Sequence, residues 1–127
     1  MATYKAPLRD MQFVMQDLLN IEKHYQSLPD CDEVNQELID AILGEASKFS
    51  EEVVAPLNAV GDEVGCQLVE DGEVRTPPGF REAYQQYVEG GWPSLEQPTD
   101  YGGQGLPMSL GTTIREMNGT ANWSWAM

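Results

Sequence analysis

Residues 31–59 have the sequence CDEVNQELIDAILGEASKFSEEVVAPLNA, the longest helical pattern in this 127-residue chain. The apolar residues in it recur every three or four positions, which places them on one side of an α-helix. They are Val34, Leu38, Ile42, Ala46, Phe49, Val53 and Leu57, flanked by Ile39, Leu43 and Val54. A stripe this wide is typical of a helix facing the core of a bundle. We therefore expect one long helix, with Pro56 kinking its last turn.

A shorter helical pattern precedes it. The apolar residues at helical spacing there are Met11, Val14, Met15, Leu18 and Tyr25. They predict a helix over about residues 10–27, ended by Leu28-Pro29-Asp30. Asp30 would then cap the long helix, since its carboxylate can accept from free amides of the first turn and Glu33 stands at the capping-box position.

The pattern changes after the long helix. We expect Gly61-Asp62 and Gly65 to stop the helix, and residues 67–76 to form a short hairpin around Asp71-Gly72. That dipeptide suits a two-residue type I′ turn.

A third helix is predicted after the hairpin. Thr76 would be its N-cap and Pro77 its first residue. Its buried side would hold Phe80, Tyr84 and Tyr87-Val88, and Gly90 would cap its C-terminus.

Glycine and proline then dominate residues 90–107, GGWPSLEQPTDYGGQGLP. Such a density excludes helix and central strand and predicts a long ordered loop. The run Gly102-Gly103-Gln104-Gly105 could cradle a phosphate, but no strand precedes it as a dinucleotide site requires. A packing role between helices is the favoured alternative.

A final helix is expected from Pro107, with Leu110, Ile114 and Met117 on its core face. Trp123 and Trp125 are two positions apart, so on a helix their rings point roughly 200° apart. One ring could face the bundle and the other a neighbouring domain or ligand; alternatively, both belong to the core. Because no cap or charged tail follows, we expect the N-terminal piece of a longer protein.

These patterns predict an all-α fold, an antiparallel bundle of about four helices with one short β-hairpin. The formal net charge of −14 disfavours nucleic-acid binding. No apolar run approaches the ~20 residues of a membrane span, and the absence of a signal peptide predicts a cytoplasmic location. Cys31 and Cys66 form no CxxC pair, so we expect reduced thiols and no metal site.

Little catalytic chemistry is visible. No nucleophile is paired with His24, the single histidine. Glu45, Glu51 and Glu52 could serve acid–base chemistry only inside a pocket, and a solvated helix face is the alternative we favour.

The order of these features resembles the N-terminal α-helical domain of the FAD-dependent acyl-CoA dehydrogenases. The segments that carry the resemblance are Glu52-Val-Val-Ala-Pro-Leu-Asn58, Gly90-Gly-Trp-Pro93 and, most specifically, Pro98-Thr-Asp-Tyr-Gly-Gly-Gln-Gly-Leu-Pro107. Ala6-Pro-Leu-Arg-Asp-Met-Gln-Phe-Val14 is similar to the opening of a bacterial subgroup with an N-terminal extension, which includes fatty acyl-CoA and 3-methylthiopropanoyl-CoA dehydrogenases. The resemblance implies an extension helix at residues 1–30 and the N-terminal domain at 31–127, with the β-domain and C-terminal α-domain lying outside this sequence.

The resemblance also implies a function for the complete enzyme. It would oxidise acyl-CoA to trans-2-enoyl-CoA, as in fatty acid β-oxidation, with FAD as cofactor, an electron-transfer acceptor as partner and a homo-oligomeric state. No catalytic, FAD-binding or metal-binding residue is assigned to this chain, which alone should be inactive. The chain would supply part of the acyl-pocket wall through Trp123, Trp125, Ala126 and Met127. The alternative is a non-enzymatic, acidic helical module that docks a partner protein.

Overall fold

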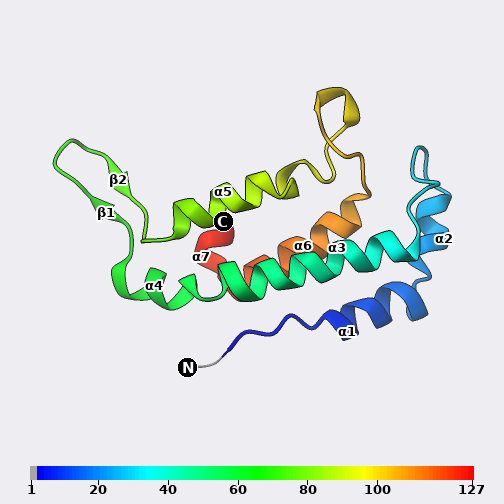
Figure 1. Cartoon of the computed structure of the whole chain (residues 1–127), viewed down its shortest axis with the longest axis horizontal. Coiled ribbons are helices and arrows are strands. Elements are labelled where there is room, and N and C mark those ends of the chain that lie inside the picture. The colour runs from blue at the N-terminus through cyan, green and yellow to red at the C-terminus, as the bar shows by residue number, and fades with distance from the viewer. Residues whose placement is uncertain (1–2) are drawn as a thin grey trace.

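The computed structural model describes residues 3–127, which are mostly helical with one short hairpin (Figure 1). In chain order the elements are α1 (Leu8–Gln12), π-helical η1 (Phe13–Leu18), α2 (Ile21–Gln26), α3 (Gln36–Phe49), π-helical η2 (Ser50–Val54), α4 (Leu57–Val64), β1 (Gln67–Leu68), β2 (Val74–Arg75), α5 (Phe80–Glu89), the 3-10 turns η3 (Trp92–Ser94) and η4 (Thr99–Tyr101), α6 (Met108–Ala121) and α7 (Trp123–Ala126). The predicted all-α class with a hairpin is confirmed. Several predicted helices are divided into shorter segments.

The core lies where α3 and α6 pack together, with α1 along the other side of α3 (Figure 1). From α6 it takes Leu110, Ile114 and Met117, as the periodicity predicted. From α3 it takes Ile39, Leu43 and Ala46, whereas Leu38 is 38% exposed. The buried face of α3 therefore keeps Ala46 of the predicted stripe but is centred on Ile39 and Leu43, two of the residues that flank it.

The predicted helix over residues 10–27 is divided by Asn20. This residue has a left-handed backbone (φ +48°) and follows a π turn in which the Leu19 amide donates to the Val14 carbonyl (3.0 Å). Asparagine tolerates that conformation better than most residues. The division turns Tyr25 fully into the core but leaves Leu18 67% exposed.

The predicted N-cap of the long helix is wrong. Asp30 has a positive φ of +61° and lies in a turn before the helix. Two further backbone hydrogen bonds of the turn type follow, one of them from the Val34 amide to the Cys31 carbonyl (3.1 Å). The side chains of Cys31 and Val34 are both buried. The helix begins only after Asn35, whose side-chain oxygen accepts from the Leu38 amide at 2.9 Å.

The predicted kink near Pro56 is present as a π turn. The Ala55 amide donates to the Ser50 carbonyl, five residues back, at 2.9 Å. The chain then continues as α4 beyond residue 59. Gly61 and Asp62 were expected to stop the helix, but both are helical, and Gly65 ends it.

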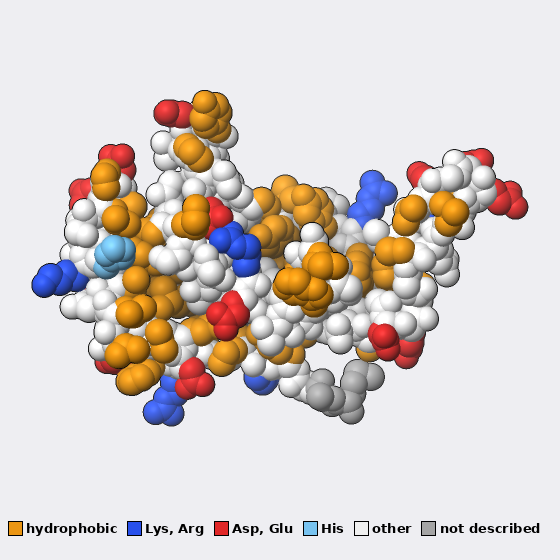
Figure 2. Space-filling model, turned by 180° about the vertical axis from the view of Figure 1, so that it is seen from behind, with side chains coloured by type: hydrophobic (Ala, Val, Ile, Leu, Met, Phe, Trp, Pro, Cys, Tyr) orange, Lys and Arg blue, Asp and Glu red, His pale blue; other side chains and the backbone are white. Residues whose placement is uncertain are grey.

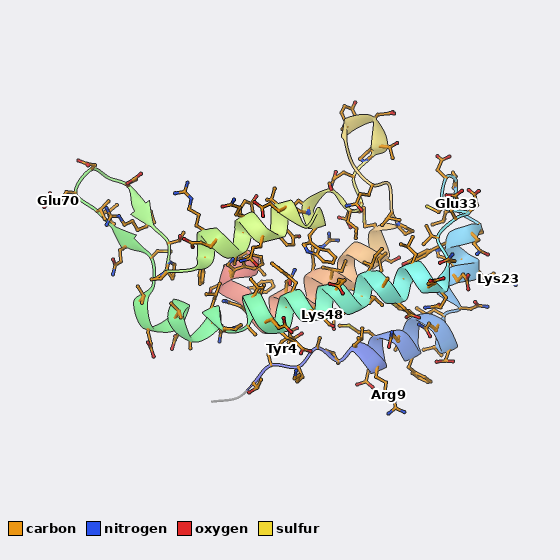
Figure 3. All side chains as sticks on the ribbon, viewed as in Figure 1. Tyr4, Arg9, Lys23, Glu33, Lys48 and Glu70 are labelled. Atoms are coloured by element: carbon orange, nitrogen blue, oxygen red, sulfur yellow. The ribbon has the colours of Figure 1, made fainter. Side chains whose placement is uncertain are left out.

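The hairpin is present, with Gln67 paired to Arg75 and Leu68 to Val74. Its turn is not type I′, because that type needs positive φ at both central residues and here only Gly72 has it (φ +77°). The Val69 amide donates to the Glu73 carbonyl (2.9 Å), which leaves a three-residue loop. Glu70 in this loop points away from the helices (Figure 3).

The predicted start of the third helix is also wrong. α5 begins at Phe80, with Gly79 in the N-cap position, so neither Thr76 nor Pro77 belongs to its first turn. Its C-terminus is at Gly90, as predicted.

The loop at residues 90–107 is ordered by its own backbone. The amides of Gly103, Gln104 and Gly105 donate to the carbonyls of Pro98, Ser94 and Gln97 at 2.9–3.0 Å. Since these amides are engaged inside the loop, they are not free to hold a phosphate. The predicted packing role is the one that this geometry supports.

Candidate functional site

Asn122 divides the last helix into two. Its extended backbone (φ −160°, ψ 94°) ends α6, and its side chain caps α7 by accepting from the Trp125 amide at 3.2 Å. The final helix predicted from Pro107 onward is therefore interrupted at Asn122. The break carries α7 against α4 (Figure 1).

The two tryptophans of α7 have different environments. The Trp125 ring is half-buried among aromatic rings, with centroids 5.7 Å from Tyr87, edge-to-face, and 5.9 Å from Phe49. Its indole N–H donates to the Phe80 carbonyl at 3.2 Å. Trp123 is 67% exposed. The rings thus diverge as expected, and the alternative that both lie in the core is excluded.

A depression of about 540 Å³ opens between α5, α6 and α7. Trp123, Trp125, Ala126 and Met127, the four residues predicted for a substrate pocket, all line it. The remaining lining residues are Tyr84, Tyr87, Thr112, Arg115, Glu116 and Asn118. The structure therefore brings the predicted residues to one concave surface that carries four aromatic side chains.

The contribution of α5 to this surface was not predicted from the sequence. Tyr84 and Val88 were expected in the core, which is wrong, since they are 59% and 48% exposed. Tyr84 and Tyr87 are three residues apart, so they lie on one helix face and their rings are 6.4 Å apart. That aromatic spacing is the signal that could have identified them. Burial raises the pKa of the Tyr87 hydroxyl above its usual value.

The charged groups of the depression belong to α6. The Arg115 guanidinium makes an ion pair with Glu96 of the loop (2.6 Å) and a hydrogen bond to Thr112 (3.1 Å). Arg115 therefore connects the loop at residues 90–107 to α6, which lines the depression. On the face of the molecule opposite to the view of Figure 1, basic and acidic side chains lie between groups of hydrophobic ones (Figure 2).

The chemistry available here is binding. The lining has aromatic rings, an arginine and Glu116, but no residue pair in which a base activates a nucleophile. Within residues 3–127 no group of His, Cys, Asp or Glu side chains could hold a metal ion, and Cys31 and Cys66 are free thiols. An apolar ligand segment is what this surface could receive.

Glu51, a candidate for acid–base chemistry, has a structural partner. Its carboxylate accepts from the Lys5 ammonium (2.6 Å) and from the Ala6 amide (3.0 Å), so it fixes the N-terminal arm. Tyr4 of this arm lies against the helices, whereas Arg9 points away from them (Figure 3). The Lys5 hydrogen bond lowers the pKa of Glu51 below its usual value, aided by the Ala6 amide and opposed by desolvation.

Comparison with known proteins gives one clear relationship. No protein-family model matches the sequence. Over 125 residues, or 98% of the chain, the sequence is 36% identical to the 3-methylmercaptopropionyl-CoA dehydrogenase of Ruegeria pomeroyi, and the chain spans 21% of that protein's length. No helix within residues 3–127 is long and apolar enough to cross a membrane. The chain is therefore homologous, over almost its whole length, to part of an enzyme of the acyl-CoA dehydrogenase family.

Proposed function

We propose that this chain is the N-terminal part of an FAD-dependent acyl-CoA dehydrogenase that converts acyl-CoA to trans-2-enoyl-CoA. The observation that carries the proposal is the 36% identity to a named acyl-CoA dehydrogenase across 98% of the chain. In that reaction the acyl chain would lose its α-proton and a β-hydride, FAD would supply the hydride acceptor, and an electron-transfer acceptor would be the partner of the complete enzyme. The division into an extension (residues 1–30) and an N-terminal domain (31–127) belongs to the same proposal.

The residues of this chain do not fit FAD itself. The loop amides that could meet a pyrophosphate donate to loop carbonyls, and a net charge of −14 repels phosphates. We therefore assign no flavin-binding or catalytic residue to this chain. FAD and the catalytic base would be held by parts of the enzyme outside it, and homo-oligomerisation would also belong to the complete enzyme.

The role proposed for this chain is a wall of the acyl pocket. Trp123, Trp125, Ala126 and Met127 line one depression whose rings offer apolar surface, and each buried methylene is worth about 0.8 kcal/mol. Aromatic rings also make favourable contacts with thioether sulfur. A short alkyl tail or a methylthio tail of the kind named for the relative would suit this surface. Trp125, fixed by its neighbours, would limit the length of the tail.

Purified complete protein tests the assignment. We expect bound flavin whose visible absorbance is bleached by acyl-CoA in the absence of oxygen. Protein without flavin, or flavin that no acyl-CoA reduces, would contradict the assignment and leave the alternative of an acidic docking module, which the exposed apolar side chains of Phe13, Leu18 and Leu19 favour.

Two substitutions test the wall. Trp123→Ala and Trp125→Ala should shift the preference of the complete enzyme toward longer acyl chains, because each removes a large ring from the depression. Trp92→Phe is the matched control, since Trp92 does not line it. An unchanged chain-length profile in both alanine variants would contradict the proposed wall.

A further inference from the structure

Asn122 uses both ends of its side-chain amide while only 1% of the residue is exposed. The amide oxygen accepts from the Ser124 hydroxyl (2.9 Å) and from the Trp125 backbone amide (3.2 Å). The amide nitrogen donates to the backbone carbonyl of Val54 at 3.4 Å. One buried side chain thus joins the start of α7 to the end of the π turn η2.

The geometry of η2 explains why the Val54 carbonyl is available. In a regular helix that carbonyl would accept from the Asn58 amide. Here the Asn58 amide donates to Ala55 instead (3.1 Å), because the π turn and Pro56 disturb the regular bonding. The side chain of Asn122 supplies the missing donor.

A second buried bond lies one helical turn away. The Ser50 hydroxyl donates to the side-chain oxygen of Asn118 at 2.8 Å, and both residues are buried. Asn118 lies on α6, and Asn122, the residue that ends this helix, follows four positions later, as Val54 follows Ser50 on the opposing segment. Two parallel cross-links therefore fix the end of α6 on η2.

We propose that Asn122 is a positioning residue for the pocket wall, which sets the place of α7 and so the depth at which the Trp125 ring stands. This inference rests on the proposed function only for its catalytic consequence. Asparagine suits the position because it offers a donor and an acceptor without charge. Serine could still cap α7 but has too short a side chain to keep both contacts, and alanine keeps neither.

The first test uses the chain itself and needs no activity. Hydrogen exchange of the Trp125 indole N–H, assigned with Trp125→Phe, reports whether that ring keeps its bond to the Phe80 carbonyl. In Asn122→Ala and Asn122→Ser we expect exchange about tenfold faster or more, because α7 opens locally. Should the alanine variant not fold, the serine variant decides the result.

Asn35→Ala is the matched control. It also removes a helix N-cap, the bond from the Leu38 amide, but at the far end of α3. It should lower the thermal midpoint without changing exchange of the Trp125 indole. Unchanged indole exchange in the Asn122 variants, or equal acceleration in Asn35→Ala, would overturn the positioning role.

The second test uses the complete enzyme. One methylene in a fitted pocket is worth 10-fold or more in discrimination. We therefore expect Asn122→Ser to bring the kcat/KM ratio between the preferred acyl-CoA and its longer homologues down by about tenfold, with Asn35→Ala unchanged. A ratio that stays at the wild-type value would overturn the consequence for specificity. An absence of acyl-CoA oxidation in the wild type would instead contradict the proposed function, while the indole measurement would still decide the positioning role.

Discussion

Replacement by alanine at three glycines of this chain should change the free energy of unfolding in three different ways. Gly103 approaches the loop backbone so closely that a Cβ there would overlap the Gln97 carbonyl, whereas the space at Gly102 and Gly44 is open within 4 Å. Gly102 has a φ of +82°, while Gly44 lies inside α3. The three alanine variants therefore separate a steric clash, a conformational cost and a helix preference.

The magnitudes follow from the contacts. Gly103→Ala must displace the Gln97 carbonyl, which accepts from the Gly105 amide at 2.9 Å, and overpacking with loss of a hydrogen bond costs about 3 kcal/mol. Gly102→Ala forces a side chain into the left-handed region at a cost of about 1–2 kcal/mol. Gly44→Ala should stabilise the chain by about 0.5–1 kcal/mol, because alanine is the better helix former.

Urea denaturation followed by circular dichroism measures all three on one scale. We expect the urea midpoint to be highest for Gly44→Ala, followed by the wild type, Gly102→Ala and, lowest, Gly103→Ala. If Gly103→Ala were as stable as Gly102→Ala, the close approach of the loop to Gln97 would be refuted. A destabilising Gly44→Ala would refute the open helix face.

Other substitutions probe the core, the buried polar bond and the N-terminal arm. Leu43→Ala should cost about 2–5 kcal/mol in urea denaturation, since the side chain is fully buried. Ser50→Ala leaves the buried Asn118 oxygen without its donor and should lower the free energy of unfolding by about 1–3 kcal/mol. A loss below about 1 kcal/mol would mean that water replaces the hydroxyl. Because the pKa of Glu51 is lowered, its pair with Lys5 stabilises the arm above the usual value of 4.5 and is lost as pH falls through the lowered value. The protection factor of the Ala6 amide, measured by hydrogen exchange relative to the unstructured rate at each pH, should therefore fall as the pH falls through that value, and Glu51→Gln should abolish this pH dependence.

Regular periodicity explains which parts of the fold could be predicted. Leu110, Ile114 and Met117 repeat without interruption, so the core face of α6 follows directly from the sequence. The stripe on α3 is wide, and its buried centre depends on where α6 packs, which no local pattern specifies. The sequence therefore predicts the helix but not its rotation about its axis.

The breaks in the helices depend on single asparagines. Asn20 takes a left-handed backbone, and Asn122 leaves the helix to bond a carbonyl far away in sequence. Nothing in their neighbourhoods distinguishes them from helical asparagines. The four residues expected at the pocket do meet. The spacing of Tyr84 and Tyr87 places both rings on one face of α5, but the surface that this face joins depends on how α5 packs, which the local sequence does not specify.

A photoreactive acyl-CoA tests the central claim most directly. With a diazirine at the tail end, bound to the complete enzyme and irradiated, the analogue should label residues 123–127 or the facing tyrosines of α5, as mapped by mass spectrometry of the peptides. Excess unlabelled acyl-CoA should suppress that labelling. Competed labelling that falls wholly outside this chain would contradict its role as a wall of the acyl pocket.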